Sequence, residues 1–277
     1  MFCCLGWQSL SKKALSLRCH NAKQTKTIYI MVEKFSADYK VTCYDADQKM
    51  RLRPSAFLNM AQEAANTHAD YLGVGYDTLD ETKQAWVMSR MKVEFLRLPM
   101  WREVVNLKSW HKGAAGFMFL RDFILTDSEG EPLVKATSSW LVVDMTTRRL
   151  ARRGAFVEFA TNEEKCIRED VIEEPAQKVV LPEGVELQRS VIHKASYSDL
   201  DMNHHVNNVM YTVWAMDAVG LEVTEELSLK ALEINFNNEI RPNDEVELSV
   251  YRLPESNTYY VDGKVEGKNS FIVRLEF

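Results

Sequence analysis

The chain has 277 residues and carries 34 basic and 40 acidic side chains, a formal net charge of −6. Its hydrophobic fraction of 46% is ordinary for a globular protein with a sizeable core, and the length suggests about two domains of ~150 residues. An acidic chain disfavours nonspecific nucleic-acid binding, which requires a clustered basic face. No apolar run approaches the ~20 residues of a membrane-spanning helix, so we expect no membrane segment.

The first 32 residues differ in composition from the rest, because they contain five basic side chains and no acidic one. This composition is typical of an organelle transit peptide, and the alternative explanation is a start codon assigned too far upstream. We favour a start at Met31 and expect residues 1–32 to be disordered and outside the fold in both cases. In the remaining chain, Cys43 and Cys166 have neither disulfide nor metal-ligand spacing, so we expect reduced cysteines and no metal site.

Spacing and alternation of apolar residues predict the elements of the first half. Residues Pro54–Leu72 place Phe57, Ala61 and Ala64 at helical spacings behind a proline that suits a first helical turn, and Gly73 ends the helix. Strands are predicted at Phe35–Cys43, Trp86–Leu96, Glu103–Trp110, Phe117–Thr126 and Leu133–Asp144. We expect these strands to form an antiparallel sheet that packs against the helix.

The charged stretch from Arg148 to Val180 predicts a linker, after which the chain repeats its first half. An offset of 154 residues matches the loop and helix of the two halves, and an offset of 141 matches the strands that follow. The matched pairs include Asp45 with Asp199, Asp47 with Asp201, Phe57 with Tyr211, Val93 with Ile234 and Phe95 with Phe236.

This duplication allows the two halves to be compared within one sequence. The second half contains Asn203, His204, His205 and Glu239, where the first half has Lys49, Met50, Arg51 and Leu98. Residues that only one of two similar folds carries point to function rather than to scaffold. The first three lie directly before a predicted helix at Val209–Val219, where free backbone N–H groups favour negative charge.

The residues of this loop carry a family resemblance. Asp201-Met202-Asn203 and His205-Val206-Asn207-Asn208, with Tyr211 and Trp214 behind them, resemble the signature of the plant and bacterial acyl-ACP thioesterases. Further segments in the same order extend the resemblance from about Phe35 to the C-terminus. These segments are Trp86-Val87, Met91 to Trp110, Arg121-Asp122, Ala136 to Trp140 and Thr147 to Leu150.

The resemblance implies an α+β fold of two tandem hotdog domains, in which each half wraps a curled antiparallel sheet around a long helix. The two halves are expected to form one continuous sheet. The implied division is a leader or misassigned start at 1–32, an N-terminal hotdog with the acyl-chain pocket at 33–147, a linker at 148–187 and a catalytic C-terminal hotdog at 188–277.

The resemblance assigns catalysis to four side chains, namely Asp201, Asn203, His205 and Glu239. The plant pattern has a cysteine directly after this glutamate, where the present chain has Ile240. A Cys-His mechanism therefore lacks its nucleophile, because neither Cys43 nor Cys166 belongs to the cluster.

We therefore expect a water-based hydrolysis. Glu239, on a predicted strand at Leu232–Ile240, is the expected general base, while Asp201 orients His205 or shares the water. Asn203 and His205 are expected to hold the thioester carbonyl and the leaving sulfur. The alternative that Asp201 is the base stays open, since either carboxylate is chemically suited to it.

Two further sets of residues are predicted to bind substrate. Candidates for the acyl pocket are Met60, Ala64, Trp86, Met88, Met91, Phe117 and Phe119, although methionines and aromatic residues are as typical of an ordinary core. The basic cluster Arg148, Arg149, Arg152 and Arg153 is a candidate surface for an acidic carrier protein and its phosphopantetheine phosphate, with a solvated linker as the alternative.

The resemblance implies an acyl-ACP thioesterase that releases free fatty acid and holo-ACP, ends chain elongation and needs no cofactor. The alternatives are an acyl-CoA thioesterase and a non-catalytic acyl-binding or dehydratase-like hotdog module. The expected partner is acyl carrier protein, with a homodimer left open. The expected location is the bacterial cytoplasm, or a plastid if the leader is a transit peptide.

Overall fold

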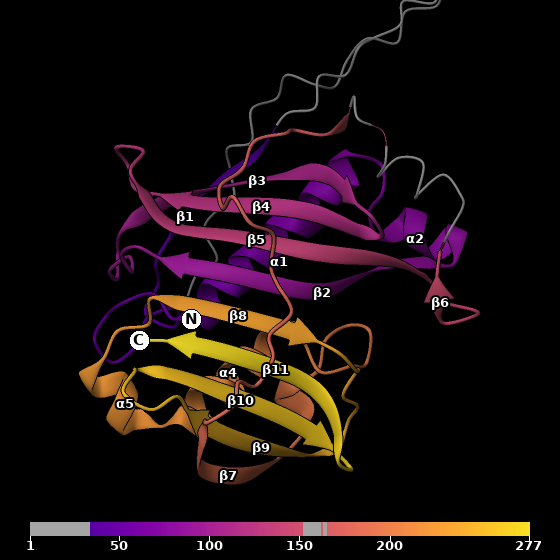
Figure 1. Ribbon diagram of the computed structural model, residues 1–277. Coiled ribbons are helices and arrows are strands. Elements are labelled where there is room, and N and C mark those ends of the chain that lie inside the picture. Colours follow the sequence, from indigo (N-terminus) through magenta and orange to yellow (C-terminus); the bar gives the residue numbers. More distant parts are fainter. Residues whose placement is uncertain (1–33, 152–161, 163–164) are drawn as a thin grey trace, which may run out of the picture. The chain divides into compact units, whose positions relative to one another are not determined.

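A computed structural model describes residues 34–151, 162 and 165–277, which form a sheet of 11 strands with helices on one face (Figure 1). The predicted leader therefore lies outside the described residues. The strands of the first half are β1 Phe35–Lys40, β2 Gln84–Phe95, β3 Val104–Ala115, β4 Met118–Thr126, β5 Pro132–Asp144 and β6 Arg149–Leu150. Those of the second half are β7 Glu186–Lys194, β8 Ala231–Phe236, β9 Glu245–Arg252, β10 Thr258–Val265 and β11 Lys268–Glu276.

The two halves share one sheet because β2 pairs with β8. The strand order is β1-β3-β4-β5-β2-β8-β11-β10-β9-β7, with β6 paired to β5, and every pairing is antiparallel. At the junction the register runs from Arg90 opposite Asn235 to Glu94 opposite Ala231. Figure 1 shows the purple β2 beside the orange β8 at this seam. The continuous sheet that the sequence predicted is therefore confirmed.

One long helix from each half packs against the sheet. Helix α1 spans Pro54–Tyr71 and α4 spans Asn208–Val219, and they are followed by the shorter α2 (Tyr76–Thr82) and α5 (Leu221–Glu226). As predicted, α1 begins at a proline, and Gly73 adopts φ 76° just beyond its end. The apolar side of α1 is buried, with Phe57, Ala61 and Ala64 at most 2% exposed.

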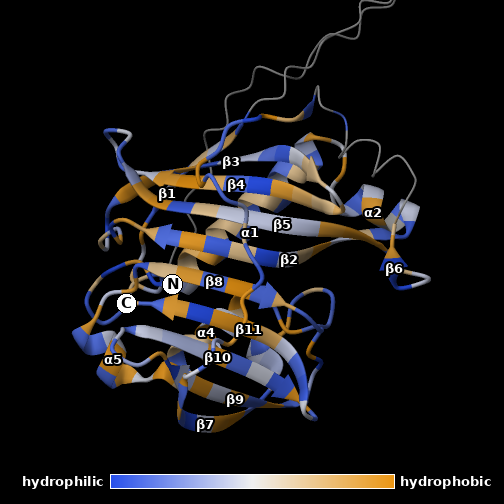
Figure 2. Ribbon diagram, in the orientation of Figure 1, coloured by the Kyte–Doolittle hydropathy of each residue, from blue (hydrophilic) through white to orange (hydrophobic). Residues whose placement is uncertain are grey.

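The second half is held by aromatic contacts between its helix and its sheet. The rings of Tyr211 on α4 and Phe271 on β11 lie with centroids 4.8 Å apart, and Trp214 lies 5.7 Å from Tyr211. Figure 2 shows apolar and polar residues alternating along β8. This alternation places every second side chain on the helical face.

The segment between the halves crosses the other face of the sheet. Its Val179 clusters with Ile272, whose neighbour Phe271 faces α4, and successive strand residues point to opposite faces. Backbone N–H groups of this segment donate to the sheet, Val171 to Asp122 Oδ2 at 2.8 Å and Val179 to Asn235 Oδ1 at 2.5 Å. The linker is thus fastened across both halves (Figure 1).

The strand predicted to contain Glu239 ends earlier than expected. The segment expected at Leu232–Ile240 leaves the sheet after Phe236, because Asn237 and Asn238 both donate their backbone N–H to the single carbonyl of Ser270, at 2.8 and 3.0 Å. Two successive donors on one acceptor turn the chain out of the strand direction. Glu239 therefore lies in an irregular segment beyond the strand end, where its side chain is exposed.

Candidate active site

A buried carboxylate anchors the loop that precedes α4. Asp199 accepts hydrogen bonds at Oδ2 from the backbone N–H and the hydroxyl of Ser196, at 2.7 and 2.9 Å, and at Oδ1 from Trp214 Nε1 at 3.2 Å. His193 Nε2 lies 3.3 Å from Oδ2. Burial by itself would raise the pKa of Asp199, but these hydrogen bonds outweigh it and hold the pKa below its ordinary value. The loop thus starts from an ionised anchor.

A second carboxylate shapes the turn itself. Asp201 Oδ1 accepts from the backbone N–H of Asn203 at 2.8 Å and of His205 at 3.3 Å, while its own N–H donates to the His205 carbonyl at 2.9 Å. The turn passes through His204, which adopts φ 61° and leaves its side chain exposed. Asp201 therefore contacts the backbone of His205, and its Oδ2 accepts from Asn203 Nδ2 at 3.5 Å.

The His205 ring pairs with Glu239. The distance between His205 Nε2 and Glu239 Oε2 is 3.4 Å. The other carboxylate oxygen, Oε1, lies 3.4 Å from Nη1 of Arg148, which comes from the turn between β5 and β6 of the first half. The structure therefore brings together His205 and Glu239, as well as a cation that the sequence had placed only in a general basic cluster.

Backbone contacts hold this pair at the start of α4. The N–H of Val206 donates to the carbonyl of Ile240 at 3.0 Å, which ties the loop to the segment of Glu239. Asn207 caps the helix by accepting the N–H of Val209 at 2.9 Å. Within α4, burial raises the pKa of Tyr211, so its hydroxyl stays protonated beside the Ile240 backbone.

The first half contains the same loop with other side chains. Asp47 Oδ1 accepts from the backbone N–H groups of Lys49 and Arg51, both at 2.8 Å, and Met50 takes the turn with φ 59°. Asp45 accepts from the N–H and hydroxyl of Thr42, as Asp199 does from Ser196. The offset of 154 residues therefore describes a repeated hydrogen-bond pattern.

A narrow apolar pocket lies between the start of α4 and the first half. We call it the site pocket; it has a volume of about 20 Å³ and is lined by Leu58, Ala61, Gln62, Met88, Met91, Phe123, Ser138, Trp140, Asn208, Val209, Ile234 and Phe236. Two predicted acyl-pocket residues, Met88 and Met91, are among them. Sequence reasoning missed Gln62, whose Oε1 is buried without a hydrogen-bond partner among the described residues. A polar residue within the apolar helix face was the available signal.

The other predicted acyl-pocket residues lie elsewhere. Met60 and Ala64 are buried in the main core, and Trp86 and Phe119 form an edge-to-face pair 5.2 Å apart in a separate cluster. Phe117 is 71% exposed at the turn between β3 and β4. None of these five residues contributes to the lining of the site pocket.

The predicted basic surface is described only in part. Arg149 begins β6 and is exposed, while Arg152 and Arg153 lie outside the described residues. Arg148 directly precedes β6 with φ 58° and contacts Glu239. Its sequence position beside Arg149 was a signal for a basic surface but not for a contact with Glu239.

The described part of the chain contains no candidate metal site and no candidate membrane-spanning helix. Nowhere in residues 34–151, 162 and 165–277 do three His, Cys, Asp or Glu side chains gather as a group that could hold a metal ion. Over the same residues, each helix is too short or too polar to cross a bilayer. Within the described residues, no disulfide joins Cys43 and Cys166.

Two family models match most of the chain. The model described as the acyl-ACP thioesterase N-terminal domain matches residues 32–154, and the one described as the acyl-ACP thioesterase C-terminal domain matches residues 186–277. The site loop and Glu239 both fall within the second match. The boundary between the two models coincides with the linker that crosses the sheet.

Curated plant proteins show the same similarity. A chloroplastic palmitoyl-acyl carrier protein thioesterase of Gossypium hirsutum is 31% identical over 255 residues, which are 87% of this chain and 60% of the relative. A chloroplastic oleoyl-acyl carrier protein thioesterase 1 of Arabidopsis thaliana is 26% identical over 225 residues, which are 77% of this chain and 62% of the relative. The chain spans about three fifths of the length of these relatives.

Solved structures share the fold. An acyl-ACP thioesterase from Bacteroides thetaiotaomicron superposes with a TM-score of 0.76 at 24% identity, covering 87% of this chain and 96% of its own. The 12:0-ACP thioesterase from Umbellularia californica gives a TM-score of 0.78 at 22% identity, covering 88% and 96%. These matches confirm the predicted fold of two hotdog units joined in one antiparallel sheet.

Proposed function

This chain belongs to the acyl-ACP thioesterase family, and from that membership we propose that it hydrolyses fatty acyl-ACP to free fatty acid and holo-ACP. One observation carries the proposal beyond the family, namely the pairing of His205 with Glu239 at the start of α4, beside the site pocket. In the proposed division of labour, residues 188–277 supply catalysis and residues 33–147 supply the acyl pocket, with 148–187 as the linker.

The attacking group is a water molecule activated by Glu239. Its carboxylate takes a proton from the water while the water oxygen bonds to the thioester carbonyl carbon, and a tetrahedral oxyanion forms. When the C–S bond breaks, the leaving thiolate takes up a proton and the fatty acid is released. His205, 3.4 Å from Glu239, is placed to pass the proton between the carboxylate and the sulfur. Because Ile240 follows Glu239, no cysteine of the described chain is available here as a nucleophile.

The start of α4 stabilises the oxyanion. Backbone N–H groups in the first turn of a helix have no acceptor within the helix, and the helix dipole favours negative charge there. Asn207 accepts the N–H of Val209 with its side chain and the N–H of Met210 with its carbonyl, so the N–H of Asn208 is the donor proposed for the substrate. Asn203, held by Asp201 on the exposed turn, adds an amide N–H to the same region.

Asp201 acts mainly as a positioning residue in this proposal. Its Oδ1 is occupied by two backbone N–H groups, and the same arrangement occurs at Asp47, where no catalytic side chains follow. Glu239 is therefore the better candidate for the base, because one of its oxygens lies beside the imidazole and the carboxylate is open to solvent water.

The acyl chain is proposed to enter the site pocket. Met88 and Met91 lie in its wall, and flexible methionine side chains adapt readily to a chain that threads between them. The pocket of about 20 Å³ must widen for a long chain, so side-chain movement accompanies binding. Of the other candidates, Met60 and Ala64 lie in the main core, and Trp86 and Phe119 lie in a separate cluster, so neither pair is proposed to contact the acyl chain in this pocket.

The carrier protein is proposed to dock beside Glu239. Arg148 and Arg149 are exposed next to the site, and Arg152 follows them in sequence. A phosphopantetheine arm that delivers the thioester to Glu239 brings its phosphate and the acidic carrier towards these cations. Replacing Arg149 by Glu should raise KM for acyl-ACP without changing kcat.

The proposal is tested by steady-state hydrolysis of acyl-ACPs from short to long, with acyl-CoAs alongside. Glu239→Ala should lower kcat by ~10²–10⁴, while Glu186→Ala, an exposed glutamate at the start of β7, is the matched control. Near-normal turnover by Glu239→Ala would contradict the assignment. Turnover of acyl-CoA alone would make the chain an acyl-CoA thioesterase, and no turnover would favour an acyl-binding module.

The location and assembly of the protein stay predictions. We propose a cytoplasmic enzyme if translation starts at Met31 and a plastid enzyme if residues 1–30 direct import. Fractionation of cells that express the full chain with a C-terminal tag, together with the N-terminal sequence of the recovered protein, distinguishes the two. The mass of the purified protein in solution tests the open alternative of a homodimer.

A further inference from the structure

The duplication creates a second cavity, related to the site pocket by exchange of the two halves. This second cavity has a volume of about 550 Å³. It is lined by Ala46, Asp47, Gln48, Arg51, Arg53, Pro54, Ser55, Leu98, Thr212, Val213, Met216, Asp217, Gly220, Leu221, Thr224, Leu227, Leu229 and Phe277. Its volume falls within the range of about 300–1,000 Å³ that is usual for small-molecule sites.

The 154-residue offset between the halves shows that the second cavity corresponds to the site pocket. The site pocket is lined by Leu58 and Gln62 from α1 and by Asn208 and Val209 from the start of α4. Adding or subtracting 154 converts these into Thr212, Met216, Pro54 and Ser55, all of which line the second cavity. The second cavity is thus the same place between the two helices, with the roles of the halves reversed.

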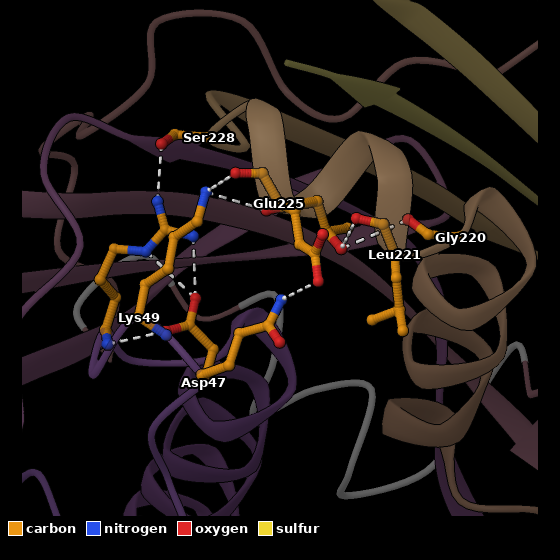
Figure 3. Close-up of polar contacts among 9 residues, drawn as sticks. Asp47, Lys49, Gly220, Leu221, Glu225 and Ser228 are labelled. Carbon is orange, nitrogen blue, oxygen red and sulfur yellow. Dashed lines mark hydrogen bonds and ion pairs between the residues drawn. The ribbon is translucent and has the colours of Figure 1, made fainter.

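The catalytic groups are missing from the second cavity. Leu98 takes the place of Glu239, and Lys49 and Arg51 stand where the site has Asn203 and His205. These two cations are already occupied: Arg51 binds Asp47 and donates to Ser228 Oγ at 2.6 Å, while Lys49 Nζ donates to the backbone carbonyls of Thr224, at 3.2 Å, and Glu225. Figure 3 shows this loop fastened to the end of α5. Hydrolysis at this cavity is therefore not expected.

Three groups at the second cavity are left to bind a ligand. The N-terminus of α1 has no side-chain cap at Arg53 and no acidic residue in its first turn, whereas α4 is capped by Asn207. Within the described residues the Arg53 side chain is exposed and has no ion-pair or hydrogen-bond partner. On the facing helix, Thr212 belongs to the lining but is 0% exposed, and its hydroxyl is buried with no hydrogen-bond partner among the residues described.

These groups favour an anionic head. A helix N-terminus and an arginine both attract a carboxylate, and a buried hydroxyl gains most from a ligand that accepts its hydrogen bond. The two acids of the lining do not oppose this, because Asp47 is paired with Arg51 and Asp217 is exposed to solvent.

The remaining walls favour an aliphatic tail. They are formed by Leu98, Val213, Met216, Leu221, Leu227, Leu229 and Phe277. An apolar cavity with a few polar groups at one end is the usual form of a site for an amphipathic small molecule.

We propose that the second cavity binds a free long-chain fatty acid without hydrolysing it. The carboxylate lies at Arg53, the start of α1 and the Thr212 hydroxyl, and the hydrocarbon lies along the apolar walls. The choice of an acyl chain as ligand rests on the proposed function, because the second cavity is the counterpart of the proposed acyl pocket. The enzyme would then bind a molecule of the same class as its product. The binding site would lie between the same two helices as the active site.

The test is calorimetric titration of dodecanoate into the Glu239→Ala variant of the full chain, with dodecanoate below its micelle concentration. Arg53→Gln should weaken a binding component about tenfold, as loss of one charge-assisted contact predicts. Thr212→Val, which removes only the hydroxyl, should weaken it a few fold. Val213→Trp, which fills the cavity from a half-buried position, should abolish it. The matched control is Lys178→Gln, an exposed cation of the linker.

Arg53 is a surface residue, so its variant remains informative even if Val213→Trp fails to fold. Dodecanoate binding that survives both Arg53→Gln and Val213→Trp unchanged would overturn the proposal, and so would the absence of binding. The outcomes distinguish this proposal from the proposed function. Turnover of acyl-ACP without dodecanoate binding at this cavity would reject only the second site. Binding at this cavity without any turnover removes only the enzymatic assignment.

Discussion

The loops before the two long helices make the same backbone hydrogen bonds but carry different side chains. In both, one aspartate accepts from a hydroxyl residue three positions earlier, and a second accepts two backbone N–H groups of the turn. Both turns pass through a residue with φ near 60°, Met50 in the first half and His204 in the second. Only the second loop carries His205 opposite a glutamate.

The comparison separates scaffold from function. Asp47 and Asp201 each accept two backbone N–H groups of their turn, so the structure of the loop is sufficient to explain Asp201. His205 and Glu239 have no such counterpart, since the first half folds the same turn with Arg51 and has Leu98 at the other position. Catalysis is therefore expected to depend on these two residues, and loop structure on the aspartates.

The largest effect is expected from exchanging the proposed catalytic pair, His205 and Glu239, for the residues at the matching positions of the first half. His205→Arg with Glu239→Leu gives the second loop the chemistry of the first, and kcat for acyl-ACP should fall by at least ~10³ because base and proton carrier are both lost. The melting temperature should change little, since the first half shows that the loop folds with these residues. Steady-state kinetics and thermal unfolding measure the two quantities.

The reciprocal exchange supplies the control. Arg51→His with Leu98→Glu, placed in the first half, should leave acyl-ACP turnover at the wild-type value. A comparable loss of kcat in this variant would show that the two loops are not functionally separate.

Removal of the turn aspartates should affect stability in both halves. Asp47→Ala and Asp201→Ala each leave two backbone donors without their carboxylate and should lower the free energy of unfolding by about 1–3 kcal/mol. Only Asp201→Ala should also lower kcat, because the turn that it holds carries His205. Denaturant unfolding with parallel kinetics checks this. If Asp47→Ala impaired kcat as strongly, the assignment of Asp47 to scaffold alone would be wrong.

Acid stability should depend on Asp199. Its pKa is held below the ordinary value in the folded protein, so its ionised form stabilises the fold above the unfolded pKa of ~3.9, and this contribution is lost as pH falls through the folded pKa. Asp199→Asn should be less stable at pH 7, and its deficit should shrink below pH ~4. Unfolding curves from pH 7 to pH 2 measure it. A deficit that is constant over this range would exclude the carboxylate charge as its cause.

The smallest effect is expected at Arg148. The ion pair with Glu239 spans 3.4 Å between half-exposed side chains, and pairs of this kind contribute about 0–1 kcal/mol. Arg148→Gln should therefore leave the melting temperature nearly unchanged and reduce kcat/KM for acyl-ACP only a few fold. Added salt should narrow the difference from wild type. A loss as large as that of Glu239→Ala would instead place Arg148 in the chemistry itself.

The helix α1, the strands and the site loop could be predicted because the residues that indicate each of them are close together in the sequence. The proline at position 54, the glycine at 73 and the spacing of Phe57, Ala61 and Ala64 were sufficient to predict α1. The 154-residue offset anticipated a repeated loop, and the motif from Asp201 to Asn208 identified the family that two models then matched. Alternation in the strands predicted the sheet, since each face has its own environment.

Long-range packing decided the rest. The sequence predicted Glu239 inside a strand, but the chain leaves the sheet after Phe236 because one carbonyl of β11 accepts two successive N–H groups. The contact of Arg148 with Glu239 joins residues 91 positions apart from different halves, and no local pattern encodes it. The volumes of the two cavities, about 20 and 550 Å³, likewise depend on how the helices of both halves fill the space between them. Residue type and spacing therefore determined the elements and the family, whereas the tertiary contacts determined which side chains meet.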